Sequence, residues 1–329
     1  MAHSTLRDVA EACGVSVSTA SRALNNRADV SPKTRIRVLE AAQRLGYVPS
    51  SLAKGLWSGE TKTVGVVVTT ILNPFYANVV TGIEEVLSDK GYTILLNSSH
   101  EDPELELRAV RLLLEQRVDG LILAPVESEP EVVEFLGKNG VPFVLVGRNV
   151  RNVEADHVVC DDRMIGELAA EHLISKGHRK ILFINSSENY SSELRLQGFC
   201  SALEKHGLSF DKDWVRPVYP NQDTKQVLSD ALDEGLDPTA VFCFCDGMAI
   251  EVIRELNRRG IKIPDEMAVI GVDNLDVTEL LNPPLTTLDV QHNTMGIRSA
   301  EILLEKMTKP EGRLEQVVLT PRLIERSST

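Results

Sequence analysis

The sequence predicts an all-α helix-turn-helix headpiece followed by an α/β domain of two doubly wound parallel-sheet lobes. Short helical patterns with capping residues fill the first 48 residues, and apolar strand runs alternate with amphipathic helices from residue 62 onward. Charge divides the chain at the same place. Residues 1–60 have a net charge of +3 within a total of −13, so the remainder has a net charge of −16. We therefore expect a small basic module joined to a large acidic body that repels phosphates.

Three short helices are expected in residues 1–48. They cover about residues 5–13, 16–25 and 31–45, and each shows apolar residues at helical spacing. The residues that cap or end them are Thr5 with Asp8, Gly14, Ser16, Ser31 with Pro32, and Gly46. Two short helices joined by a tight glycine turn, with a third that closes the core, predict a helix-turn-helix.

The second helix is expected to enter the major groove of DNA. Val17 and Ser18 at its start, with Arg22 one turn later, are placed to reach base edges, and Arg22 can donate two parallel hydrogen bonds to a guanine. The short polar side chains suited to phosphates are Ser16, Thr19, Ser21 and Asn25. The alternative is that the serine and threonine only cap the helix and that Arg22 is a surface charge.

Residues 49–60 are expected to form a hinge helix and linker. Pro49 interrupts the chain, Ser50 can cap, and Leu52, Ala53 and Leu56 make one apolar stripe. Roughly six residues do not form a stable helix alone, so this segment needs a partner, such as its own copy in a dimer on DNA. Leu56 would then be an apolar wedge at a minor-groove base step, unless the segment is an ordinary linker.

The large domain, residues 61–329, alternates strands and helices. The expected strands are Val64–Val68, Tyr92–Leu96, Gly120–Ala124, Val141–Val146, Lys180–Ile184, Ala240–Cys243 and Met267–Val272. The expected helices include Phe75–Lys90, Leu105–Gln116, Gly166–Lys176, Glu193–His206 and Met248–Arg259. These are too many strands for one comfortable sheet, and Val150–Asp156 has the character of a crossing between two halves. We expect two lobes with a ligand cleft at the carboxyl ends of the strands.

The loops after these strands carry polar and aromatic groups suited to a polyol. They hold Asn73, Phe75 and Tyr76 after the first strand, Arg148 after the fourth, and Arg195, Cys245, Asp246 and Asp273 in the second lobe. Aromatic rings stack on a sugar face, and Arg and Asp make several hydrogen bonds to hydroxyl groups.

The sequence resembles the LacI/GalR family of bacterial regulators over nearly its whole length. The motifs that carry the resemblance are Thr5-Leu6-x-Asp8-Val9-Ala10, Gly14-Val15-Ser16, Thr19-x-Ser21-Arg22-x-Leu24-Asn25, Val30-Ser31-x-x-Thr34-Arg35, Leu45-Gly46-Tyr47-x-Pro49, Ala53-x-x-Leu56, Asp246-x-Met248-Ala249, Pro284-Leu285-Thr286-Thr287-Leu288 and Pro321-Arg322-Leu323-Ile324-Glu325-Arg326. The implied fold of the large domain is that of periplasmic binding proteins of type I. The implied N-lobe covers about residues 61–160 and 291–321, and the implied C-lobe covers about 161–290 and 322–329.

The resemblance also implies two sets of contact residues. The implied DNA contacts are Thr5, Ser16, Val17, Ser18, Thr19, Ser21, Arg22, Asn25, Ser31, Thr34, Tyr47, Ala53 and Leu56. The implied effector contacts are Asn73, Phe75, Tyr76, Arg148, Arg195, Tyr219, Cys245 and Asp273. Two residues depart from the family pattern, because Cys245 stands where Asn or Thr is common and Val290 where Gln is common. Each departure removes a hydrogen bond to the ligand.

The expected function is therefore that of a transcriptional regulator, with a repressor as the first choice, that binds a pseudo-palindromic operator as a homodimer. A small-molecule effector, a sugar such as a pentose first, would control it allosterically. A nucleobase or nucleoside is the alternative, because Phe75 and Tyr76 could sandwich a base, and a protein co-effector stays open. The sequence leaves the operator undetermined, and also whether the effector releases DNA or promotes binding.

The sequence lacks the motifs that are typical of several enzyme classes. No G-x-G-x-x-G, G-x-x-x-x-G-K or G-x-S-x-G occurs and the histidines are scattered, so we expect no enzyme, catalytic residue, cofactor or metal. The five cysteines lie mostly in apolar runs, and Cys243 and Cys245 have no metal-ligating partners nearby. Neither a signal-peptide pattern nor a run of about 18 apolar residues is found, so we expect a cytoplasmic protein without membrane contact. The same observation argues against a sugar-transport protein without DNA function.

Overall fold

The computed structural model describes residues 4–48, 60–126, 130–187, 189–209, 211–219, 222–309 and 312–329. The chain divides into two compact units, Met1–Lys62 and Thr63–Thr329. The expected hinge helix, with Ala53 and Leu56, lies outside the described residues. No described helix is both long and apolar enough to cross a bilayer.

The first unit contains the three expected helices, α1 (Leu6–Cys13), α2 (Val17–Leu24) and α3 (Pro32–Leu45). Their apolar faces meet in one small core, made largely of alanine and valine. The fully or nearly fully buried members are Val9, Ala10, Ala20, Ala23 and Val38. Small side chains let short helices approach closely, so eight-residue helices that would not persist alone are stabilised by packing.

The helix ends follow the capping chemistry of the sequence. The Thr5 hydroxyl accepts a hydrogen bond from the Asp8 amide, and the Asp8 carboxylate accepts one from the Thr5 amide at 2.7 Å. Gly14 ends α1 at φ 60°, in the left-handed region that glycine adopts without strain. Ser16 caps α2, with its hydroxyl 3.0 Å from the amide nitrogen of Thr19. The helix-turn-helix prediction is confirmed.

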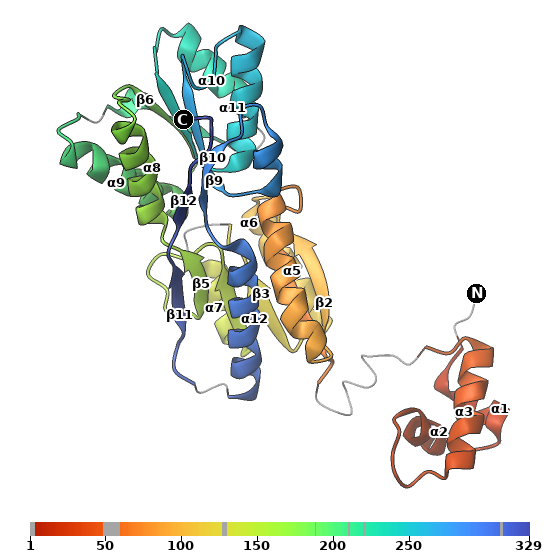
Figure 1. Cartoon of the computed structure of the whole chain (residues 1–329). Helices are drawn as coiled ribbons and strands as arrows, with labels where there is room; N and C mark the ends of the chain where they lie inside the picture. Colours follow the sequence, from red (N-terminus) through yellow and green to blue (C-terminus); the bar gives the residue numbers. More distant parts are fainter. Residues whose placement is uncertain are drawn as a thin grey trace. The chain divides into compact units, whose positions relative to one another are not determined.

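The N-lobe of the second unit is built on an all-parallel six-stranded sheet in the order β11-β5-β4-β3-β1-β2 (Figure 1). Its strands are β1 (Thr63–Val68), β2 (Thr93–Ser98), β3 (Gly120–Leu123), β4 (Phe143–Val146), β5 (His157–Cys160) and β11 (Gln316–Leu319). Two helices pack on each face of the sheet, so its central strands are buried on both sides. These helices are α5 (Pro74–Asp89) and α12 (His292–Thr308) on one face and α6 (Pro103–Glu115) and α7 (Glu131–Asn139) on the other.

The C-lobe repeats this architecture with the sheet order β12-β10-β9-β8-β6-β7, in which only β12 is antiparallel to its neighbour. Its strands are β6 (Ile181–Ser186), β7 (Val215–Val218), β8 (Ala240–Cys243), β9 (Ala268–Asp273), β10 (Thr286–Asp289) and β12 (Arg322–Ile324). Its helices are α8 (Asp162–Ser175) and α9 (Tyr190–Lys205) on one face and α10 (Thr224–Asp233) and α11 (Asp246–Arg259) on the other. Two 3₁₀ segments, Lys212–Trp214 and Asp276–Leu280, complete it. The two doubly wound lobes confirm the predicted fold class.

The chain passes between the lobes after β5, after β10 and after β11. The expectation that Val150–Asp156 crosses between them is wrong. This segment joins β4 to β5, which are neighbours in the same sheet, with Leu145 paired to His157. The prediction failed because β5 has only four residues and was not recognised as a strand in the sequence.

Helices α8 and α9 approach each other so closely that only glycine fits at their contact. A Cβ atom on Gly166 of α8 would collide with the backbone carbonyl of Arg195, and one on Gly198 of α9 would collide with that of Arg163. This contact fixes the start of α8 beside the first turns of α9, where the cavity between the lobes begins.

Candidate functional site

A cavity of 140 Å³ lies between the two lobes, at the carboxyl ends of strands from both sheets. Seven of the eight predicted effector residues line it, namely Asn73, Phe75, Tyr76, Arg148, Arg195, Cys245 and Asp273. Tyr219 does not line it; it follows β7 and is 51% exposed. The position of the cavity follows from topology, because the loops that leave parallel strands gather at one edge of each sheet.

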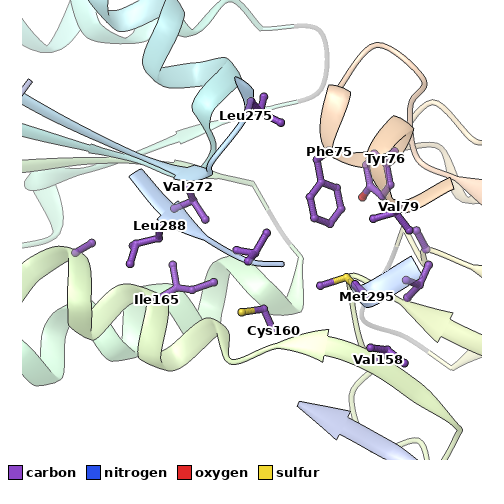
Figure 2. Close-up of a cluster of buried hydrophobic side chains, with 14 of the residues drawn as sticks. Phe75, Tyr76, Val79, Val158, Cys160, Ile165, Val272, Leu275, Leu288 and Met295 are labelled. Atoms are coloured by element: carbon purple, nitrogen blue, oxygen red, sulfur yellow. The ribbon is translucent and has the colours of Figure 1, made fainter. Parts of the chain in front are cut away.

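An apolar cluster runs from one lobe to the other beside this cavity. Figure 2 shows Phe75, Tyr76, Val79, Val158 and Met295 of the N-lobe on one side and Ile165, Val272, Leu275 and Leu288 of the C-lobe on the other, with Cys160 between them. Both lobes therefore share one buried core. A ligand in the cavity would rest against apolar walls while polar groups bind it from the strand ends.

Arg195 is held in place by three groups of the C-lobe. Its Nε donates to Asp162 at 2.7 Å, Nη1 donates to the Phe244 carbonyl at 2.5 Å, and the guanidinium lies 4.1 Å from the centre of the Phe244 ring. The Arg195 and Asp162 side chains are only 10% and 7% exposed. The arginine is thus fixed before any ligand arrives, which lowers the entropic cost of binding.

Arg148 of the N-lobe makes a two-pronged ion pair with Glu101. Nη1 and Nη2 donate to the two carboxylate oxygens at 2.8 and 2.9 Å. Burial by itself would raise the pKa of the Glu101 carboxyl, but the charge and hydrogen bonds of Arg148 lower it below its usual value. The guanidinium of Arg148, which we expected to contact the ligand, is therefore already bound to Glu101.

Asp273 ends β9 with its side chain in the cavity and is 5% exposed. Its Oδ2 atom is buried without a hydrogen-bond partner, and burial raises the pKa of the carboxyl well above its usual value. Its backbone has φ 122°, a conformation rare for residues other than glycine. A buried carboxyl oxygen without a partner is costly, so it favours a ligand that donates a hydrogen bond to it.

The two aromatic residues of α5 do not form the sandwich considered for a flat base. The rings of Phe75 and Tyr76 are 4.9 Å apart at their centroids with an interplanar angle of 81°, so they meet edge to face. A flat ligand can therefore stack on one of them but cannot lie parallel to both.

Two thiols also line the cavity. Burial raises the pKa of both Cys160 and Cys245 to about 12, so both are protonated at neutral pH. In the part of the chain that the structure describes, no group of three or more His, Cys, Asp or Glu could hold a metal ion. Val290, the second departure from the family pattern, presents an apolar wall to the cavity.

Sequence reasoning missed Glu101 and Asp162, which bind the two arginines. Glu101 follows β2, a strand that was correctly expected, so its loop could have been searched in the same way as the others. Asp162 begins α8 directly after β5, which was not recognised. The remaining unforeseen lining residues are Thr70, Gly147, Cys160, Ser186, Ser191, Phe244, Met248 and Met295.

In the headpiece, the face of α2 opposite its buried alanines is open to solvent. Val17 is 43% exposed and Ser18 lies beside it. Arg22, with a side chain 54% exposed, forms an ion pair with Asp29. These three residues occupy the face expected to meet base edges.

The remaining predicted DNA contacts surround that face or cap helices. Thr5, Ser16 and Ser31 cap the three helices, and Thr34 is paired with Ser31. Asn25 caps the end of α2, and its side-chain amide donates to the Ser21 carbonyl. Tyr47 packs against the headpiece core. The capping roles are the alternative that the sequence left open, and they coexist with exposed hydroxyl groups.

Two family models match the chain. Residues 5–50 match the model described as bacterial regulatory proteins of the lacI family, and residues 61–327 match that of periplasmic binding proteins and the sugar-binding domain of the LacI family. One similar curated relative is the HTH-type transcriptional repressor PurR of Aliivibrio fischeri strain MJ11, which is 32% identical over 331 residues that cover 98% of both chains.

Two solved structures illustrate the likeness. The lac repressor dimer bound to operator and the anti-inducer ONPF has a TM-score of 0.84 and 26% identity, over 99% of both chains. A LacI family transcriptional regulator from Enterococcus faecium with bound ribose has a TM-score of 0.73 and 31% identity, over 81% of this chain and 98% of that one. The likeness to the first structure extends through both units of the chain.

Proposed function

This chain belongs to the LacI family of bacterial regulatory proteins, and from that membership we propose that a small molecule held between its lobes controls how tightly its headpiece binds an operator. The chain is a DNA-binding transcriptional repressor and not an enzyme. The observation that carries the proposal is the cavity at the carboxyl ends of both sheets, where the buried Asp273 oxygen has no partner.

The ligand we propose first is a sugar, with a pentose ahead of others. Asp273 accepts from a hydroxyl, Asn73 and Ser191 add polar groups, and Phe75 supplies a ring for a sugar face. The similar regulator with bound ribose supports this choice. A nucleobase or nucleoside is the second candidate, because the ring of Phe75 or Phe244 could stack on a flat base.

On the DNA side, we propose that α2 lies in the major groove with Val17, Ser18 and Arg22 at base edges. Asp29 holds the Arg22 guanidinium when no DNA is present. Both side chains are about half exposed, so DNA can displace the carboxylate at little cost. Guanine N7 and O6 would then accept the arginine hydrogen bonds.

The regulator acts as a homodimer in this proposal, and the second unit has exposed leucines that a partner could cover. Leu95 and Leu96 are 36% and 44% exposed on β2, the edge strand of the N-lobe sheet, and Leu72 and Leu280 are 87% and 84% exposed. Exposed leucines on a sheet edge favour burial against a second copy. The similar lac repressor is a dimer on its operator.

The test distinguishes the DNA-binding function of the headpiece from the ligand-binding function of the second unit. Binding sites are selected from a random duplex library with the full chain, and sugars and nucleosides are then screened for an effect on binding to the selected site. Arg22→Ala should abolish site preference while leaving ligand affinity unchanged, and Asp273→Ala should abolish the ligand response while leaving site preference unchanged. If both folded variants lose both activities, the division of labour is wrong.

A further inference from the structure

The charges in the cavity cancel in pairs. Two arginines line it, and each is already bound by a carboxylate that also lines it, Arg148 by Glu101 and Arg195 by Asp162. Asp273 is the remaining acidic side chain of the lining, and a carboxyl group carries no positive charge in either protonation state. The described wall of the cavity therefore offers an incoming anion no uncommitted cation.

The Arg148–Glu101 pair is the more exchangeable of the two. Arg195 has a second partner in the Phe244 carbonyl and stacks on the Phe244 ring, whereas Arg148 donates both of its hydrogen bonds to Glu101. An anionic ligand that took the fork of Arg148 would leave the Glu101 carboxylate, whose side chain is 33% exposed, beside a second negative charge. Glu101 thus competes with anions for that arginine.

The loop that carries Glu101 is built to keep its carboxylate there. His100 and Glu101 both have left-handed backbones, at φ 54° and 58°, which costs energy for residues other than glycine. Such conformations persist where surrounding structure enforces them. The loop is anchored at the preceding residue, the buried Ser99, whose amide donates to the Val68 carbonyl of β1 at 2.9 Å.

We propose that Glu101 makes the cavity selective for uncharged ligands over anionic ones, by occupying the guanidinium fork of Arg148. The inference rests on the effector cavity of the proposed function and narrows its ligand to uncharged hydrogen-bond donors. Phosphorylated sugars and sugar acids are thereby rejected, although the cavity contains two arginines.

The test is a titration of the full-length protein with inorganic phosphate, followed by calorimetry. Wild type should show no binding that depends on Arg148. Glu101→Gln and Glu101→Ala, which release the guanidinium, should gain phosphate affinity by about tenfold or more. The double variant Glu101→Ala with Arg148→Met should lose that gain. Phosphate held by the basic headpiece is common to all variants and cancels in the comparison.

The matched control is Glu234→Gln. It releases Arg216, which pairs with Glu234 at 2.6 Å and does not line the cavity, so phosphate affinity should stay at the wild-type value. Thermal unfolding checks that each variant is folded. If neither Glu101 variant folds, Arg148→Met still decides, because it should leave the phosphate affinity of the wild-type cavity unchanged.

Two results would overturn the inference. One is wild-type phosphate binding that Arg148→Met removes, and the other is folded Glu101 variants that gain nothing. Both are distinct from a failure of the proposed function, which would appear as a small molecule that binds the cavity without altering operator binding. Direct titration does not depend on that coupling.

Discussion

Asp246 is a carboxyl group with no exposed surface that lies behind the cavity rather than in its wall. It accepts hydrogen bonds from the Leu275 amide at 2.9 Å and the Thr287 hydroxyl at 2.6 Å. Burial outweighs these bonds and raises its pKa to about 7. Because that value lies above the pKa of the unfolded chain, the folded state binds more protons at this site, and stability falls as the pH rises.

We expect Asp246 to lower the free energy of unfolding as the pH rises from about 4 to about 7, by at most about 1.4 kcal/mol per pH unit. Asp246→Asn should remove this contribution, because its amide can accept from Leu275 and donate to Thr287. Urea denaturation of both proteins at several pH values measures the difference.

The difference in the free energy of unfolding between Asp246→Asn and wild type should then stop changing with pH above about pH 7. A difference that does not change with pH between 5 and 7 would mean that Asp246 is ionised throughout that range in the folded protein.

At the scale of single residues, the sequence predicted many of the residues that line the cavity. It did not predict the ion pairs that these residues form with one another. Asn73, Arg148 and Asp273 were found because they follow recognisable strands. The hydrogen bonds of Arg148 to Glu101 depend on how two loops from strands β2 and β4 meet, and a sequence pattern does not contain that distance.

At the scale of elements, the contact between α8 and α9 positions the arginine of the C-lobe. Asp162 begins α8 and Arg195 lies on the second turn of α9, so the distance between these helices sets their ion pair at 2.7 Å. Gly166 and Gly198 make this approach possible.

Gly166→Ala and Gly198→Ala should each separate the two helices. The added methyl group meets backbone atoms, which cannot rotate away, so we expect a loss of about 1–3 kcal/mol in the free energy of unfolding. Ligand affinity should fall as well, because Arg195 moves from Asp162. Urea denaturation and ligand titration measure the two effects.

Gly137→Ala is the matched control, because Gly137 lies in α7 and a Cβ atom there would have no neighbour within 4 Å. It should leave stability unchanged or raise it by up to about 1 kcal/mol, since alanine favours helix. Equal destabilisation by all three substitutions would point to a general cost of replacing glycine.

The elements that the sequence predicted are the long or strongly apolar ones. All seven expected strands and the five named helices are present, with small shifts at their ends. The missed strands are short or mixed: β7 reads Val-Arg-Pro-Val, and β11 lies at a sheet edge with exposed residues. Tertiary pairing rather than local pattern makes such segments strands.

At the scale of the whole second unit, an ion pair among the described residues joins the lobes outside the cavity. Arg151, in the segment after β4, reaches Glu193 of α9 at 2.5 Å, and its guanidinium lies 5.5 Å from the centre of the Tyr190 ring. Ser191 and Arg195 of the same helix line the cavity. The contact therefore favours the arrangement of the lobes seen in this structure, with the cavity between them.

Arg151→Ala should speed ligand dissociation by up to about tenfold, since an exposed ion pair and a cation–π contact together contribute about 1–2 kcal/mol. Stopped-flow measurement of the dissociation rate tests this. Glu193→Gln should have a smaller effect in the same direction, because the ring contact remains.

The association rate should change little in either variant. An unchanged dissociation rate in Arg151→Ala would show that the lobes stay together without this contact.

Strands β11 and β12 each complete a different sheet at its edge, although they follow one another within residues 316–324. During translation, neither sheet can be completed until these few residues have been synthesised. A chain that ended before Gln316 would lack the edge strand of both sheets. We expect such a chain to aggregate or to be degraded, with neither lobe active, because open sheet edges pair with other chains.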